Sequence, residues 1–98
     1  MIDLYTAPTP NGWKVAMALE EMNLDYKVKY VDLANEGQHT EKFLGLNPNG
    51  RIPVIVDNDA NGLTIFDSNA ILFYLSEKTG ALLPHRGSER HKVMQWLM

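Results

Sequence analysis

The sequence predicts an α/β domain built on a mixed four-stranded sheet, and three observations lead to that fold class. Short apolar runs with the two-residue period of strands alternate with longer stretches that have the helical period. A helix lies between the first two predicted strands, so these strands should be parallel and joined by a right-handed crossover. The last two predicted strands are separated by a short turn rich in Asn and Gly, which favours an antiparallel hairpin.

The first half of the chain predicts a strand, a helix and a second strand. Residues 2–5 form a short strand that ends before two closely spaced prolines. A helical pattern follows, with Asn11 as its N-cap and Asn23 near its end. Its core positions are Val15, Leu19 and Met22. Residues 26–33 alternate between apolar side chains and lysines, which indicates a half-buried strand.

The second half predicts two strands and two helices. The expected elements are a polar loop over residues 35–40, a helix over 41–46, a strand over 54–57, a hairpin connection over 58–62, a strand over 63–66 and a helix over 68–79. Gly80 ends the last of these helices. The order β-α-β-α-β-β-α, with helices on both faces of the sheet, is typical of a thioredoxin-like domain.

The end of the chain predicts the start of a further helix. Ser88 can cap a helix from Glu89 onward, and the apolar stripe of Val93, Met94 and Leu97 continues to the last residue. We therefore expect residues 1–82 to form the thioredoxin-like domain. Residues 83–98 would be a linker and the first part of a C-terminal helical domain whose remainder is absent.

Composition restricts the classes of function. Nine basic and twelve acidic residues give a net charge of −3, which argues against a general nucleic-acid-binding protein. The sequence shows neither an apolar run long enough for a membrane span nor the pattern of a signal peptide. Cysteine is absent, so any sulfur chemistry must use a sulfur that arrives with the ligand, and a reducing cytoplasm is the expected location. The histidines lack the spacing of metal ligands, and no metal site is expected.

Two segments combine features that suit a small charged peptide. Pro53 precedes a β-branched run, so it marks a turn into a strand and is a candidate for a cis peptide bond. Asp67 and Ser68 open a helix, where free backbone N–H groups lie beside a carboxylate and a hydroxyl. Together these features indicate a site for a thiol-bearing peptide.

Three motifs in this order resemble the N-terminal domain of glutathione transferases. They are Tyr5–Val15, Asn47–Pro53 and Asp67–Leu72, and the resemblance covers essentially all of residues 1–86. The chain is most similar to the bacterial nu class and to the related fungal nitrogen-regulation protein. The resemblance implies glutathione as co-substrate, with no permanently bound cofactor.

The resemblance implies that Thr9 and Asn11 contact the glutathione sulfur. Both precede or open the first helix, where unpaired N–H groups and the helix dipole favour a thiolate. Lowering the pKa of a thiol from about 8.5 by about two units requires roughly 2.7 kcal/mol. At pH 7, about three quarters of the thiol groups are then ionised to thiolate. The alternative is that Thr9 is an ordinary loop residue and Asn11 only a cap.

The resemblance also assigns the peptide-binding contacts. The main chain of Ile52, before a cis Pro53, would pair with the cysteinyl part of glutathione as an added strand does. Ser68 would bind the γ-glutamyl carboxylate and Asp67 the γ-glutamyl ammonium. Each segment also has a plain structural interpretation, as a turn proline and as a helix cap.

Three further residues have weaker assignments. Gln38 and Arg51 would approach the glycyl end of glutathione, although each could equally be a solvated loop side chain. Tyr5 lies where other transferase classes keep a catalytic tyrosine, but a core aromatic with its hydroxyl at the edge is the favoured interpretation.

The leading hypothesis is a cytosolic, nu-like glutathione transferase that activates the thiol for attack on electrophiles or disulfides. The resemblance implies disulfide reductase activity and a homodimer at full length, whereas this chain alone can bind without turnover. One alternative is a non-catalytic module that binds glutathione or a partner protein. Another is a free-standing domain that associates through the stripe of Val93, Met94, Trp96 and Leu97.

Overall fold

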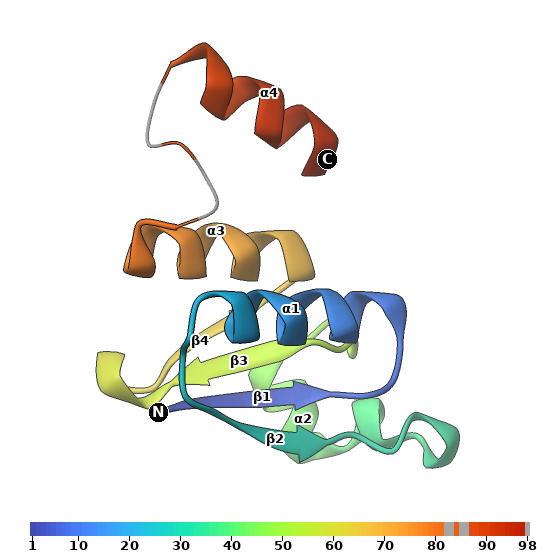
Figure 1. Ribbon diagram of the computed structural model, residues 1–98. Helices are drawn as coiled ribbons and strands as arrows, with labels where there is room; N and C mark the ends of the chain where they lie inside the picture. Colours follow the sequence, from blue (N-terminus) through green and yellow to red (C-terminus); the bar gives the residue numbers. More distant parts are fainter. Residues whose placement is uncertain (82–83, 85–86, 98) are drawn as a thin grey trace.

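The computed structural model describes residues 1–81, 84 and 87–97, and Figure 1 shows their arrangement. The strands are β1 (Ile2–Thr6), β2 (Tyr26–Tyr30), β3 (Val54–Asp57) and β4 (Leu63–Phe66). The helices are α1 (Pro10–Glu21), α2 (Glu41–Leu46), α3 (Ser68–Thr79) and α4 (Ser88–Leu97). Short 3-10 turns cover Leu33–Asn35, Gly37–His39 and Asn58–Ala60.

The four strands form one mixed sheet in the order β2-β1-β3-β4. Strands β1 and β2 are parallel, with Leu4 opposite Val28. Strand β3 is antiparallel to both β1 and β4. The predicted α/β fold class and the mixed four-stranded sheet are therefore confirmed.

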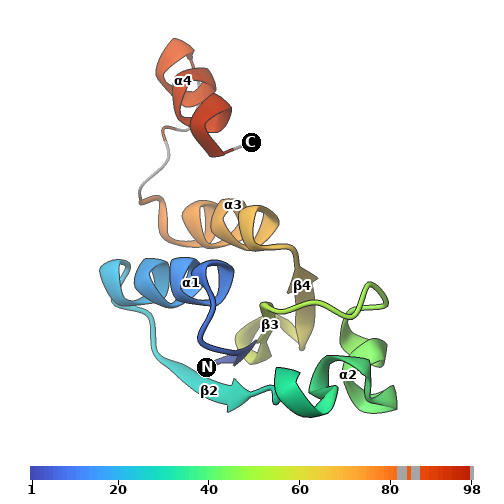
Figure 2. The same ribbon diagram turned by 90° about the vertical axis from the view of Figure 1, so that its right-hand side faces the viewer.

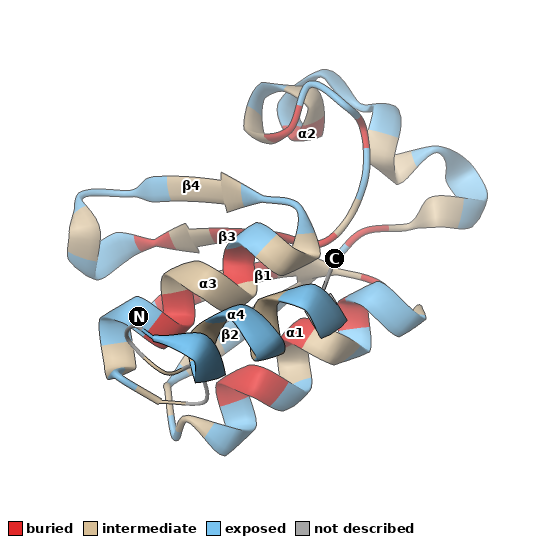
Figure 3. Cartoon of the chain, turned by 90° about the horizontal axis from the view of Figure 1, so that it is seen from above, coloured by how far each residue is buried: buried red, intermediate tan, exposed pale blue. Residues whose placement is uncertain are grey.

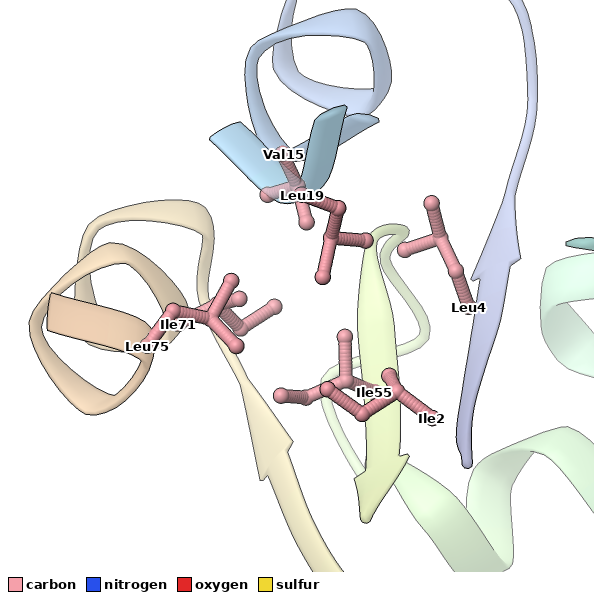
Figure 4. Close-up of a cluster of buried hydrophobic side chains, with 7 residues drawn as sticks. All are labelled: Ile2, Leu4, Val15, Leu19, Ile55, Ile71 and Leu75. Atoms are coloured by element: carbon pink, nitrogen blue, oxygen red, sulfur yellow. The ribbon is translucent and has the colours of Figure 1, made fainter. Parts of the chain in front are cut away.

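Helices cover both faces of this sheet. Figures 1 and 2 show α1 and α3 together on one face and α2 on the other. The buried side chains of the core under α1 and α3 are all aliphatic (Figure 4), and they are Ile2, Leu4, Val15, Leu19, Ile55, Ile71 and Leu75. Burial of each such side chain contributes roughly 1.5–3 kcal/mol. A smaller core under α2 contains Val31, Phe43 and Val54.

The structure corrects the prediction for the second strand. The alternating pattern predicted a half-buried strand over residues 26–33, but β2 ends at Tyr30, and Val28 and Tyr30 are 55% and 66% exposed. The reason is that β2 is an edge strand. Only Tyr26 is packed against the core, and its hydroxyl donates a hydrogen bond to Glu20 on α1.

The prediction that Asn11 caps the first helix is wrong. Helix α1 begins at Pro10, and Thr9 is its N-cap, with an extended backbone and a side-chain oxygen that accepts from the Gly12 N–H. The fixed φ of proline suits the first position of a helix, so the cap falls on the residue before it. Asn11 is therefore inside the first turn.

The boundaries of α2 and α3 agree with the sequence-based ones, and Gly80 ends α3 with a positive φ of 72°. Helix α4 begins at Ser88, one residue earlier than predicted. Parts of the expected linker, residues 83 and 85–86, lie outside the described residues, as do residue 98 and the Leu97 side chain of the predicted stripe.

Exposure varies from the centre of the sheet to its edge. Figure 3 shows β3 as mainly buried and β4 as a partly exposed edge strand.

Within the described part of the chain, no helix has the length and apolar character needed to cross a membrane.

Candidate functional site

Two adjoining hollows lie where β1 ends and where α1, β3 and α3 begin. The first, of about 160 Å³, is lined by Asn11, Asn47, Asn49, Arg51, Ile52, Pro53, Phe66, Asp67 and Ser68. The second, of about 310 Å³, is lined by Thr9, Asn11, Leu33, Gln38, Gly50, Arg51 and Ile52. Three residues are common to both hollows, so the hollows form one continuous surface. Every site residue predicted from the sequence lies on it.

The start of α1 presents Thr9 and Asn11 to the second hollow. The Thr9 Oγ1 accepts a hydrogen bond of 3.1 Å from the Gly12 N–H, and its own hydroxyl hydrogen remains available to a ligand. Gly12 allows this approach, because a Cβ there would lie 2.4 Å from the Ala7 carbonyl oxygen. Asn11 is exposed in the first turn, where the positive end of the helix dipole favours an anion.

The loop before β3 presents a main chain that has unused hydrogen-bonding groups. The Ile52–Pro53 peptide bond is cis, as the resemblance implied. Within the part of the chain that the structure describes, neither the N–H nor the C=O of Ile52 makes a hydrogen bond. Arg51 beside it is exposed and forms no ion pair with a described residue.

The start of α3 presents Ser68 to the first hollow. Asp67 is the N-cap, with a positive φ of 75°, and its Oδ1 accepts from the N–H groups of Asn69 and Ala70. Ser68 is the first helical residue, and neither its hydroxyl nor its N–H has a partner among the described residues. Lys14 of α1 donates to the Asn69 side chain at 2.9 Å, which ties the two helix starts together.

The turn at Gly37–His39 closes the far side of the second hollow. The Gln38 Oε1 is buried and lacks a hydrogen-bond donor among the described residues. The His39 ring pairs with Glu36 and also lies against Gly50, where an added Cβ would approach it to 3.0 Å. This contact joins the Gln38 turn to the loop that carries Arg51.

Tyr5 lies away from these hollows. Its ring packs against Phe43 of α2, with centroids 6.5 Å apart and an interplanar angle of 58°. It lines a separate hollow on the α2 face of the sheet. This position agrees with the interpretation of Tyr5 as a core aromatic.

The opposite end of the sheet contains a buried carboxylate that is fully paired. Asp57 Oδ2 accepts from the Tyr74 hydroxyl at 2.6 Å and from the Lys78 ammonium at 2.7 Å, and Oδ1 accepts from the Asp59 N–H. Burial alone would raise the pKa of Asp57, but the hydrogen bonds from Lys78, Tyr74 and Asp59 together hold it below its usual value. Burial and the bond to Asp57 raise the pKa of Tyr74 to about 12.

Sequence reasoning missed several residues that shape the hollows. Asn47 was named only as the first residue of the motif Asn47–Pro53 and was given no role in the site, yet it is buried and lines the first hollow. Asn49, Gly50, Phe66 and Leu33 also line the surface without having been predicted. The signal that could have found Asn47 is an amide side chain directly before a proline in a short loop, where Asn commonly bonds to its own backbone.

Among the described residues, no three His, Asp or Glu side chains are grouped closely enough to hold a metal ion.

Comparison with known proteins identifies relatives over almost the whole chain. The family model described as glutathione S-transferase, N-terminal domain, matches residues 1–77. Disulfide-bond oxidoreductase YfcG from Escherichia coli is 52% identical over 101 residues, which cover 99% of this chain and 47% of that protein. Protein URE2 from Eremothecium gossypii is 35% identical over 95 residues, which cover 90% of this chain and 27% of that protein.

The fold also matches solved structures. A glutathione transferase family member from Pseudomonas fluorescens, solved with two glutathione bound, has a TM-score of 0.94 and 44% identity, covering 99% of this chain and 44% of that one. The expected resemblance to the N-terminal domain of glutathione transferases, with bacterial and fungal relatives, is thus confirmed. The chain spans less than half the length of each of these three proteins.

Proposed function

Because the chain belongs to the glutathione S-transferase family, of which it contains the N-terminal domain, we propose that it binds glutathione across the two hollows. The observation that carries this proposal is the convergence of all the predicted site residues on one surface. That surface collects free hydrogen-bonding groups from the starts of two helices and from one loop. A short, charged peptide can use all of them at once.

The proposed pose follows from the charges along glutathione. The γ-glutamyl carboxylate binds the free N–H and hydroxyl of Ser68 at the start of α3, where the helix dipole favours an anion. The γ-glutamyl ammonium lies beside Asp67, whose Oδ1 already caps the helix. The cysteinyl main chain pairs with Ile52 next to the cis Pro53.

The glycyl end lies in the second hollow in this pose. Arg51 there provides a cation for the glycyl carboxylate. Gln38 provides an amide at the same end of the hollow.

The thiol then lies at the start of α1, against Thr9 and Asn11. Thr9 can donate its hydroxyl hydrogen to the sulfur while its oxygen continues to accept from Gly12. Asn11 can donate from its amide. These donors and the helix dipole stabilise a thiolate over a thiol, which lowers the thiol pKa.

For the full-length protein we propose glutathione-dependent disulfide reduction in addition to transfer onto electrophiles. The thiolate attacks one sulfur of a disulfide, so a new S–S bond forms as the old one breaks and the leaving thiolate takes a proton. A second glutathione thiolate then attacks the mixed disulfide and releases glutathione disulfide and the second thiol. The name of YfcG and the two glutathiones on the P. fluorescens protein support this sequence.

We further propose the organisation of the whole protein. Residues 1–82 form the glutathione-binding domain, and residues 83–98 are the linker and the first part of a helical domain. The full-length protein is a homodimer in the cytoplasm. The absence of cysteine from this chain agrees with a reducing compartment.

Calorimetric titration of glutathione and of glutathione disulfide into this chain tests the binding proposal. We expect saturable binding that Asn11→Ala and Ser68→Ala each weaken by about tenfold, as for the loss of one hydrogen bond to a charged group. Asn35→Ala and Thr64→Ala remove an amide and a hydroxyl outside the hollows, and should leave the affinity unchanged. Absence of binding by the folded chain would contradict the proposal.

The alternative of a non-catalytic binding module has a separate test. Full-length protein should reduce a small dialkyl disulfide in the presence of glutathione, and Thr9→Ala should slow this reaction. Binding without any turnover would favour the binding module.

A further inference from the structure

Asn47 connects the end of α2 to the loop that carries Ile52. Its side chain is buried, with 2% of the residue exposed. The Asn47 Nδ2 donates to the Arg51 carbonyl oxygen at 2.8 Å, and its Oδ1 accepts from the Asn49 N–H at 2.9 Å. Its main-chain oxygen also accepts from the Gly50 N–H at 3.0 Å. Asn47 therefore holds the loop at three points.

The orientation of the Asn47 amide is fixed by its partners. A carbonyl oxygen can only accept a hydrogen bond and a backbone N–H can only donate one. A flipped amide would therefore place its oxygen against the Arg51 carbonyl oxygen and its NH₂ group against the Asn49 N–H. The amide nitrogen must therefore face the Arg51 carbonyl.

The Arg51 carbonyl and the Ile52 N–H belong to the same peptide plane. In a trans peptide these two groups point in opposite directions, and the only cis bond described in the structure is the following one, Ile52–Pro53. The bond from Asn47 to Arg51 consequently sets the direction of the Ile52 N–H. That N–H is unpaired within the described residues, and Ile52 lines both hollows.

We propose that Asn47 is a positioning residue for glutathione recognition. It holds the Arg51–Ile52 peptide plane so that the Ile52 N–H is offered to the main chain of the bound peptide. This inference rests on the proposed function. Asn47 itself acts through Ile52, and its replacement should weaken binding even though the residues that contact glutathione are all retained.

The substitution Asn47→Asp provides a direct test, because it keeps the acceptor for Asn49, removes the donor to Arg51 and adds a negative charge beside the Arg51 carbonyl. At pH 7 an aspartate would repel the Arg51 carbonyl, and we expect glutathione to bind at least tenfold more weakly by calorimetry. Burial beside the Arg51 carbonyl should raise the pKa of the new carboxyl above its usual value, so lowering the pH to 5 should protonate part of it, restore the donor and recover part of the affinity. Glutathione keeps the same charge at both pH values, since its carboxyl groups titrate lower and its thiol higher.

Two controls separate this effect from other changes. Glutathione affinity of the wild-type chain, measured at both pH values, shows how much of any pH effect comes from the nearby charged groups His39, Arg51 and Asp67. Tyr74→Phe removes a hydrogen bond to the buried Asp57 carboxylate at the opposite end of the sheet, so it lowers stability without touching the hollows. It should bind glutathione as tightly as wild type.

Amide NMR resonances give a readout that a loss of stability would not move. In wild type, saturation with glutathione should shift the Ile52 and Ser68 amide protons downfield. In the Asn47→Asp chain at saturation and pH 7, the Ser68 shift should remain and the Ile52 shift should be lost.

Each outcome has a distinct meaning. Affinity within twofold of wild type, with an unchanged Ile52 shift, would overturn the role of Asn47 while the proposed function stands. Absence of binding by wild type would remove both. If Asn47→Asp does not fold, the wild-type spectrum can still overturn the inference, because the inference requires that binding shifts the Ile52 amide.

Discussion

The polar groups at the two ends of the sheet differ in whether they are hydrogen-bonded within the protein. At one end, the Asp57 carboxylate is fully buried and accepts from Tyr74, Lys78 and the Asp59 N–H. At the other end, the main chain of Ile52 and the hydroxyl and N–H of Ser68 have no partner among the described residues. Ile52 and Ser68 are half-buried, and polar groups that are unpaired within the protein and lie together on one concave surface indicate a place for a ligand.

This difference separates stability from binding along a single strand. Strand β3 begins just after the cis Pro53 and ends at Asp57. Substitutions at the Asp57 end should therefore change the free energy of unfolding without changing glutathione affinity. Substitutions at the Pro53 end should change glutathione affinity without changing the free energy of unfolding, unless they also distort the backbone.

The largest effect on stability is expected for Asp57→Asn. The change removes the charge that pairs with Lys78 and leaves the Tyr74 hydroxyl with a poorer acceptor, so the free energy of unfolding should fall by about 3 kcal/mol. Urea denaturation at pH 7 measures this. Glutathione affinity of the folded variant should equal that of wild type.

Asp59→Asn is the matched control, because Asp59 forms an ion pair with the Met1 ammonium in which the side chains are 57% and 70% exposed. Exposed pairs contribute little, so its effect should stay below about 1 kcal/mol. Equal effects of the two substitutions would contradict the importance of burial at Asp57.

Gly12→Ala should disturb the binding end. Its Cβ would lie 2.4 Å from the Ala7 carbonyl oxygen, so the first turn of α1 must shift, at a cost of about 2 kcal/mol. Thr9 and Asn11 shift with it, and glutathione affinity should fall as well. Urea denaturation and calorimetry measure the two effects.

Gly45→Ala is the control for this change, because a Cβ at Gly45 in α2 meets nothing within 4 Å. It should raise stability by about 0.5–1 kcal/mol through helix propensity alone. A Gly12→Ala chain as stable as wild type would show that the close approach at Gly12 is unimportant.

Lowering the pH should reduce the stability of the folded chain through Asp57, with a smaller effect than the substitutions above. The folded-state pKa of Asp57 is lower than that of the unfolded chain, which is about 3.9. Its contribution to stability is therefore present above about pH 4 and is lost as pH falls through the folded-state pKa. The melting temperature should decline less between about pH 5 and pH 2 in Asp57→Asn than in wild type. Parallel declines in the two chains would contradict this assignment.

The sequence predicted the fold well because its local signals agree with one another. Periodicity, the Asn-rich hairpin and Gly80 set the boundaries of α2, β3, β4 and α3 correctly. The exposure of β2 could not be predicted, since alternation does not reveal which strand lies at the edge of the sheet. The cap at Thr9 was missed because Asn11 is an equally good capping residue, and the fixed φ of Pro10 decides between them.

The predicted site residues were brought together by tertiary structure that the motifs do not specify. The resemblance placed Thr9, Ile52 and Ser68 in three separate segments, and only the sheet order and the helix packing make them neighbours. Asn47 was missed because its role depends on a bond to Arg51, four residues later, in a loop with irregular geometry. Asp57 was likewise missed, because its partners on α3 are remote in the sequence.

Amide chemical-shift mapping of the ¹⁵N-labelled chain during a glutathione titration tests the central comparison most directly. We predict saturable shifts at Thr9, Asn11, Ile52 and Ser68, with the amides of Asp57, Tyr74 and Lys78 unmoved. Shifts concentrated around Asp57, or spread evenly over both ends of the sheet, would contradict the assignment of binding to one end and stability to the other.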